Sequence, residues 1–306
     1  MTSLNTSNFE NNILNTQNSD ENIRKLASQR ELYSKAKRIY SLQIALATIG
    51  VVALSLASFK FEIQWIIATY GVCVTLFDLT YLNEKIKKVK SEAAIIQEMF
   101  DCDVLGIEWN SLIQMIEPNK IYRNSEKYFK KNKSFGSLRD WYSSKIEGIN
   151  PIHAKLICQY TNCSYDKSLR NKFYNCTCAL YSLVAFSIFA MACAKGITIR
   201  NLFESVLLPL LPLIVLSINK SKENTSSVKT SEQIITKTND PSSIKNINDD
   251  DANHLSRDLQ NIILRNRIES PLVFDWFYNL NRDDLEQEMD YSVQNLVDLY
   301  HQNTIE

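Results

Sequence analysis

Four windows are the most strongly apolar stretches of the sequence, and their lengths constrain the fold more than any other feature. They span residues 40–59, 63–82, 177–194 and 197–218. A helix rises about 1.5 Å per residue, so about 20 apolar residues cross the roughly 30 Å hydrocarbon core of a membrane. Any one window could instead form a buried core helix, but four core helices would leave too little polar sequence alternating with them. The sequence therefore predicts four membrane-spanning helices.

Short connections group the four windows into two hairpins, and two windows contain residues that are unusual in a membrane. The second window includes Asp78, and Pro209 and Pro212 interrupt the fourth. A charge inside a membrane usually faces protein or water, and a proline removes a backbone donor and kinks its helix. These three residues are therefore candidates for a pore or gate. The alternatives are that Asp78 reaches the nearby headgroups and that both prolines are inert.

Lys and Arg residues are concentrated before the first window, after the second, before the third and after the fourth. By the positive-inside rule, both termini and the middle segment lie in the cytoplasm, and the turns near Lys60 and Lys195 face outward. The expected parts are a cytoplasmic N-terminal helix (1–39), the hairpins (40–82 and 177–218), a cytoplasmic middle domain (83–176), a polar linker (219–252) and a cytoplasmic C-terminal helical segment (253–306).

The polar segments are expected to be helical as well. Residues 84–100 place apolar side chains at alternating steps of three and four, which is typical of an amphipathic helix. Only Gly71 interrupts the stretch from residue 63 to residue 100, so this stretch is expected to form one long helix. The predicted fold is mainly α: a four-span helical protein whose cytoplasmic domain combines the middle segment and the C-terminal tail.

The sequence lacks the motifs of common enzymes. Its three histidines have no HExxH partner, no phosphate-binding glycine loop is present, and the seven cysteines lack the spacing of a zinc site. The chain contains 34 basic and 34 acidic residues, a balance that argues against a polybasic nucleic-acid binder. We therefore expect no enzyme activity, no cofactor, no metal site and no nucleic-acid partner.

Three blocks of residues are similar to a known family. They are Leu26-Ala27-x-Gln29-Arg30-x-Leu32-Tyr33; Phe100-Asp101-x-Asp103-Val104-Leu105 with Cys158-Gln159-x-x-Asn162; and Ser270-Pro271-Leu272-Val273-x-Asp275-Trp276. With the two hairpins, they resemble the S-4TM family of pore-forming effectors of bacterial conflict systems. The resemblance implies an effector in the bacterial inner membrane, encoded with nucleotide-signalling anti-phage systems such as CBASS. The resemblance also implies that this effector permeabilises the membrane of its own host cell, which results in abortive infection.

Four residues of the cytoplasmic segments are candidates for contact with a nucleotide second messenger. Arg170 and Arg267 are the candidate phosphate partners, and Trp141 and Trp276 are candidate surfaces for base stacking. Arg30 is a further arginine that could bind an anion. The alternative is structural, because arginines also pair with carboxylates and tryptophans also pack in cores. The carboxylates in question are Asp101, Asp103, Asp166 and Asp275.

The predicted function is a homo-oligomeric membrane effector that senses a cytoplasmic signal and opens a lesion in the lipid bilayer. Oligomerisation is part of this prediction because a four-helix protomer has little room for a polar pore. Two alternatives stay open: a small channel or transporter, and a scaffold that anchors a cytoplasmic binding domain to the membrane.

Overall fold

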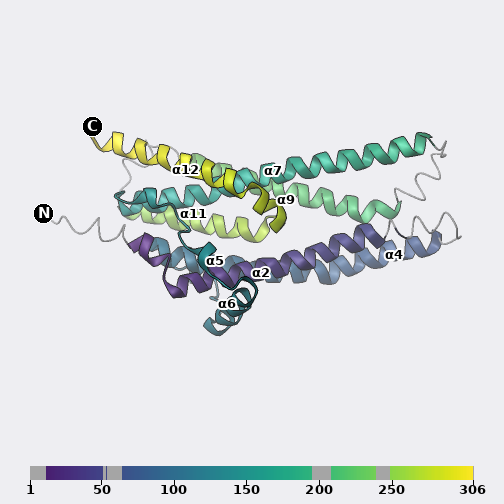
Figure 1. Ribbon diagram of the computed structural model, residues 1–306, viewed down its shortest axis with the longest axis horizontal. Coiled ribbons are helices and arrows are strands. Elements are labelled where there is room, and N and C mark those ends of the chain that lie inside the picture. Colours follow the sequence, from purple (N-terminus) through teal and green to yellow (C-terminus); the bar gives the residue numbers. More distant parts are fainter. Residues whose placement is uncertain (1–11, 51–52, 54–63, 195–207, 239–248, 306) are drawn as a thin grey trace.

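Long helices lie side by side along one axis of the molecule (Figure 1). The computed structural model describes residues 12–50, 53, 64–194, 208–238 and 249–305. This part of the chain is mainly helical and contains no strand, as expected for an α fold. Its α-helices are α2 (Asp20–Ala45), α4 (Gln64–Phe77), α5 (Asn83–Leu105), α6 (Pro118–Asn132), α7 (Pro151–Ala194), α9 (Leu208–Thr238), α11 (Asp249–Glu269) and α12 (Asp275–Ile305).

The prediction of a four-span transmembrane fold is wrong for the described residues. None of their helices combines the length and the apolar content that a membrane crossing requires. α4 has 14 residues, fewer than the about 20 needed, and the helical run continues from it into Asp78. α2 includes only residues 40–45 of the first window. The predicted turns near Lys60 and Lys195 lie outside the described residues.

The long helix expected from residue 63 to residue 100 is present as an uninterrupted helical run from Gln64 to Leu105. A five-residue π-helical stretch, η2 (Asp78–Leu82), joins α4 to α5 within it. The Asp78 carboxylate accepts hydrogen bonds from the Gln43 amide of α2 and from Asn83 Nδ2, the latter at 3.2 Å. Asp78 therefore joins α2 to this run, and whether it also lines a pore stays a prediction.

More than half of the segment expected as a polar linker (219–252) is helical. α9 continues to Thr238, and residues 239–248 lie outside the described residues. The reason is a stripe of small polar side chains at helical spacing. Ser227 and Ser231 are buried, and Asn266 of α11 donates to the Ser227 carbonyl at 3.4 Å and to Ser231 Oγ at 3.2 Å. Polar composition therefore does not prevent this helix from packing against α11.

The prolines of the fourth window fall at the edge of the described residues. Pro209 and Pro212 belong to α9, which is described from Leu208 onward, and residues 195–207 before it lie outside the described residues. Whether the two prolines kink a span or act as a gate therefore stays a prediction. The side chains of both prolines lie outside the described residues.

The buried core and the exposed apolar side chains occupy different ends of the molecule. The core lies where α2, α5, α7 and α12 meet, around the fully buried Leu26, Ile96 and Phe100. At the other end, α4 and the last turns of α7 extend together to the right in Figure 1. Large side chains are exposed there: Trp65, Val72, Leu76 and Leu79 of the α4–η2 run, and Leu180, Leu183 and Phe186 of α7. We call these seven residues the apolar end.

Candidate functional site

A cavity of about 1240 Å³ lies among α2, α7, α11 and the segments that precede α7 and α12. Its lining includes eight basic and six acidic side chains, so its charge balance is positive although the whole chain is neutral. Three of the lining cations have no carboxylate partner among the described residues: Arg30, Lys90 and Arg139. The cavity is large enough for a ligand with several ring systems, and its charge favours an anion.

Arg30 is the lining cation whose environment is most specific. It projects from the middle of α2, and its guanidinium lies 5.8 Å from the centre of the Trp141 ring. The Trp141 ring is itself held in place, because it packs edge-on against the buried ring of Phe100, with 6.2 Å between the two ring centres. A guanidinium stacked on an aromatic ring keeps its N–H donors available for a phosphate. Arg30 and Trp141 thus offer an anion site beside an aromatic surface.

Arg170 lines the same cavity, and its donors are already engaged. Its Nε pairs with Asp166 Oδ2 at 2.6 Å, one turn earlier in α7. Its two Nη atoms donate to the Pro271 carbonyl at 3.0 Å and to Ser270 Oγ at 2.7 Å. These contacts join α7 to the segment between α11 and α12. Arg170 therefore has a structural role here, and its contact with a ligand stays a prediction.

Arg267 also lines the cavity and is held by a buried carboxylate. Its Nη1 lies 2.6 Å from Asp101 Oδ2, and the Asp101 side chain is fully buried. Asp101 also accepts hydrogen bonds from Gln260 Nε2 at 2.9 Å and from the Tyr142 hydroxyl at 2.8 Å. A buried carboxylate needs such partners, because burial disfavours its charged form. The pair joins α11 to α5, and ligand contact by Arg267 likewise stays a prediction.

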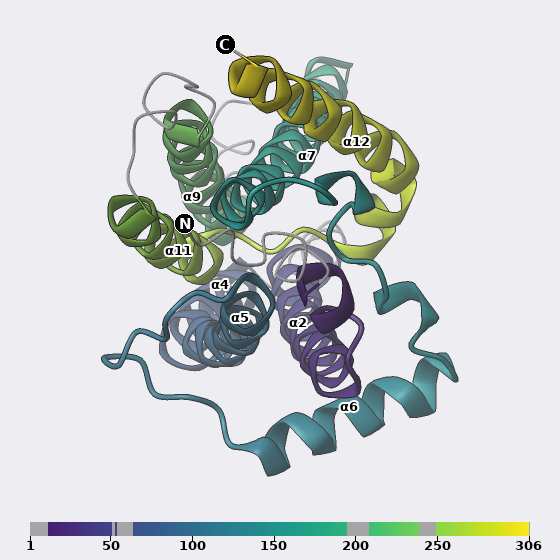
Figure 2. The same cartoon turned by 90° about the vertical axis from the view of Figure 1, so that its left-hand side faces the viewer.

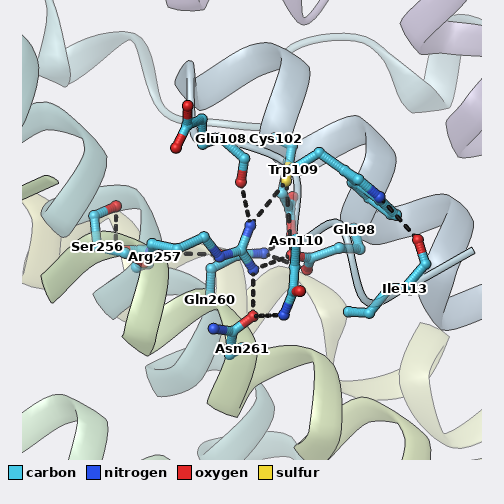
Figure 3. A network of polar contacts seen from close by, with 12 residues as sticks. Glu98, Cys102, Glu108, Trp109, Asn110, Ile113, Ser256, Arg257, Gln260 and Asn261 are labelled. Carbon is cyan, nitrogen blue, oxygen red and sulfur yellow. Dashed lines mark hydrogen bonds and ion pairs between the residues drawn. The ribbon is translucent and has the colours of Figure 1, made fainter. Parts of the chain in front are cut away.

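A second buried carboxylate extends this network along α5. Arg257 Nη2 lies 2.6 Å from Glu98 Oε1, and Gln260 Nε2 donates to Glu98 Oε2 at 2.8 Å. Figure 3 shows Arg257 between α5 and α11, where it also donates to the Glu108 carbonyl at 2.7 Å. Burial, and secondly the charge of Asp101, raises the pKa of Glu98. The paired carboxylates therefore fix α11 against α5 along one wall of the cavity.

Two other polar side chains of the lining have shifted pKa values. Burial raises the pKa of Tyr33 to about 12, so its hydroxyl stays protonated at neutral pH. Burial lowers the pKa of Lys90 to about 8, and its Nζ donates to the Ser270 carbonyl at 2.7 Å. Both shifts follow from the cost of a charge in a poorly hydrated site. Tyr33 adds a neutral hydroxyl, and Lys90 adds a mainly positive amine, to the lining of the cavity.

The cavity brings together three of the four predicted ligand residues. Arg170, Arg267 and Trp141 line it, whereas Trp276 does not and is 60% exposed on α12. Among the described residues, no group of His, Cys, Asp and Glu side chains is placed to hold a metal ion. The cavity can therefore bind an anion with an aromatic part through its own side chains.

Sequence reasoning missed Glu98 and Arg257. One signal was available, because Glu98, Asp101 and Leu105 continue the spacing of Ala94 along α5, and all four are buried. A carboxylate within an apolar stripe implies a buried cation. Nothing in the sequence indicates that this cation is Arg257, which is 159 residues away along the chain.

Comparison with known proteins gives the same family over nearly the whole chain. The family model described as the SMODS-associating 4TM effector domain matches residues 11–296. A protein of Bacillus cereus (strain VD146), described as a probable CBASS effector molecule, is 26% identical over 292 residues, which is 90% of this chain and 95% of that protein. No solved structure matches the chain. The chain therefore belongs to the family of SMODS-associating 4TM effector domains.

Proposed function

We propose that this chain is a CBASS-type effector that binds a nucleotide second messenger in its cavity and then permeabilises the inner membrane of its bacterial host. Membership of the family implies a role in anti-phage defence. The finer parts of the proposal are the ligand, the membrane and the assembly of several copies. Each of these parts is supported by a different feature of the molecule.

The observation that carries the ligand part is the cation–π pair of Arg30 and Trp141, with 5.8 Å between the guanidinium carbon and the ring centre. Nucleotides combine phosphates with flat bases, so a guanidinium free of carboxylates beside an indole ring matches both parts of such a ligand. The adjacent Tyr33 hydroxyl and the Lys90 amine add donors in the same cavity. A charge-assisted hydrogen bond contributes about 1.5–3 kcal/mol, and a stacked base about 1–3 kcal/mol.

Two helices connect the cavity to the apolar end. α2 contributes Arg30 to the lining and ends at Ala45, and α7 contributes Arg170 and ends at Ala194, beyond Phe186. A ligand that binds one arrangement of these helices more tightly shifts the population toward that arrangement. A shift from about 1% to about 99% needs about 5.5 kcal/mol of differential binding. Two phosphate contacts and one stacked base suffice for this.

The apolar end supports the membrane part of the proposal. Trp65 is 70% exposed and Phe186 is 69% exposed, and Leu79 and Leu183 are each 62% exposed. Large apolar side chains exposed along two helices at one end of the molecule are typical of contact with lipid or with other protein copies. The core is filled with side chains, so a path for ions is expected between copies of the chain. The proposal includes no catalytic turnover of the ligand.

The test is ligand binding by the full chain, measured by titration calorimetry with a panel of cyclic di- and trinucleotides. We expect one ligand class to bind and to be recovered chemically unchanged. Arg30→Gln should weaken its binding roughly 10- to 100-fold, the loss of one charge-assisted contact. Arg24→Gln is the matched control, because Arg24 also projects from α2 and lies 5.1 Å from the centre of the Tyr122 ring, yet it lies outside the cavity.

Binding that both variants retain in full would contradict the assignment of Arg30. Absence of binding across the panel would contradict the nucleotide-sensing part. In that case, permeability that does not depend on a ligand would favour a small channel or transporter. Absence of any permeability would favour a scaffold.

A further inference from the structure

Helix α6 differs from the rest of this neutral chain in charge and in placement. It contains five basic residues and one acidic residue within 15 positions. Figure 2 shows it lying crosswise on the outside of α2, whereas the other helices run along the long axis. It begins at Pro118, which suits the first turn of a helix, and ends where Lys133 adopts the left-handed conformation.

The inner face and one flank of α6 are fixed against the bundle. Ile121 and Tyr128 are buried against the core. Lys120 pairs with Glu92 of α5 at 2.7 Å, and Lys131 pairs with Glu31 of α2 at 2.5 Å. Because these contacts come from both ends of the helix, they set its rotation as well as its position.

The same rotation presents a basic stripe to the outside. Arg123, Lys127 and Lys130 follow one another at steps of four and three, so they share one face of the helix. All three are exposed, and none forms an ion pair with a described residue. Three unpaired cations in a row on a rigid helix are an uncommon arrangement in a chain with no net charge.

The helix that carries the stripe crosses the first half of α2, where Glu126 pairs with Arg24 and Lys131 pairs with Glu31, so it lies away from the apolar end (Figure 1). Its residue Ile121 packs in one cluster with Tyr40, the first residue of the first apolar window, and with Ile86, which follows the second window by a few residues. Two further cations of α2, Lys35 and Arg38, are exposed shortly before Tyr40. Basic residues gathered on an amphipathic helix are typical of a surface that meets anionic headgroups.

We infer that α6 is an interfacial helix whose basic stripe binds the anionic headgroups of a phospholipid membrane. This inference rests on the proposed action at a membrane and adds the lipid class and the residues. A single helix that lies on the outside of the bundle can contact a flat anionic surface along its length. Each Lys or Arg near such a surface strengthens binding about five-fold. A nucleic acid is the other polyanion, but the neutral chain offers it no extended basic surface.

The test measures flotation of the full chain with two kinds of vesicle, phosphatidylcholine alone and phosphatidylcholine mixed with phosphatidylglycerol. We expect tighter binding to the mixed vesicles and a decrease of that preference at high salt. The triple variant Arg123→Gln, Lys127→Gln, Lys130→Gln should lose the preference, roughly 100-fold for three charges. The control triple is Lys229→Gln, Lys237→Gln, Arg265→Gln, exposed cations of α9 and α11, which should retain it.

Hydrogen exchange in the wild-type protein tests the same inference without a substitution. Residues 118–132 should be better protected with the mixed vesicles than with phosphatidylcholine alone. An equal loss of the preference for mixed vesicles in both triple variants, or no protection of α6 from hydrogen exchange, would overturn the inference. Binding to both vesicle types without preference would overturn it and leave the proposed function intact, whereas absence of any vesicle binding would contradict both. Binding of duplex DNA or RNA that only the α6 triple loses, with vesicle binding unchanged, would assign the stripe to nucleic acid and overturn the inference.

Discussion

The helices of the bundle make different contacts at its two ends. At the core end, the buried carboxylates Glu98 and Asp101 each have an arginine of α11 within 2.6 Å, and apolar side chains are covered. At the apolar end, side chains as large as Trp65 and Phe186 are more than two-thirds exposed. The comparison teaches that side chains within the described residues hold the core end together, whereas the described residues leave the apolar end uncovered; the proposed function assigns its contacts to lipid or to further copies.

The largest expected effect concerns the buried pair at the core end. Asp101→Asn removes the charge that Arg267 faces and leaves a cation largely buried without a counter-charge. Breaking a buried pair in this way lowers the free energy of unfolding by about 3–5 kcal/mol. Urea unfolding followed by circular dichroism measures it.

The control for this prediction is Glu288→Gln, which breaks an exposed pair with Lys172. Exposed ion pairs contribute about 0–1 kcal/mol, so this variant should resemble the wild type. Equal losses in the two variants would contradict the claim that the buried network holds the core end.

An intermediate effect is expected from Lys90, whose pKa burial lowers to about 8. Its pKa in the unfolded chain is about 10.4, so between these values the unfolded state binds more protons than the folded state. The free energy of unfolding therefore rises with pH across this window, by up to about 3 kcal/mol. Lys90→Met should lack this rise. Unfolding curves of both proteins between about pH 8 and about pH 10 test it, and parallel pH dependence would contradict the burial of a charged Lys90.

The smallest effect on stability is expected at the apolar end. Phe186→Ser replaces an exposed side chain, so the free energy of unfolding should change by less than about 0.5 kcal/mol. The same variant should bind phosphatidylcholine vesicles more weakly than the wild type. A loss of several kcal/mol with unchanged vesicle binding would mean that this end is part of the folded core.

The sequence predicts the helical elements well where one stripe of a helix is apolar. Residues 84–100 belong to α5, and the C-terminal segment forms α11 and α12. Polar composition gave no sign of how α9 packs: Ser227 and Ser231 are buried in it, and Asn266 of α11 donates to the Ser227 carbonyl and to Ser231 Oγ. The four-span fold was inferred from the length and apolar content of the windows, but no described helix combines the length and the apolar content that a membrane crossing requires.

The candidate site was only partly predictable. Arg170, Arg267 and Trp141 do meet at one cavity. An arginine has free donors only where no carboxylate of another helix pairs with it. The spacing of residues along the chain does not predict such long-range pairs. Asp101 engages Arg267 across 166 residues, whereas Arg30 lies over the Trp141 ring and has no carboxylate partner among the described residues.

The measurement that tests the central claim most directly is dye release from vesicles that contain the full chain, before and after a cyclic nucleotide is added. The account predicts little release without ligand, strong release with one member of the nucleotide panel, and loss of this response in Arg30→Gln but not in Arg24→Gln. Release that is independent of every nucleotide, or equal in wild type and Arg30→Gln, would contradict the claim that the cavity controls the apolar end.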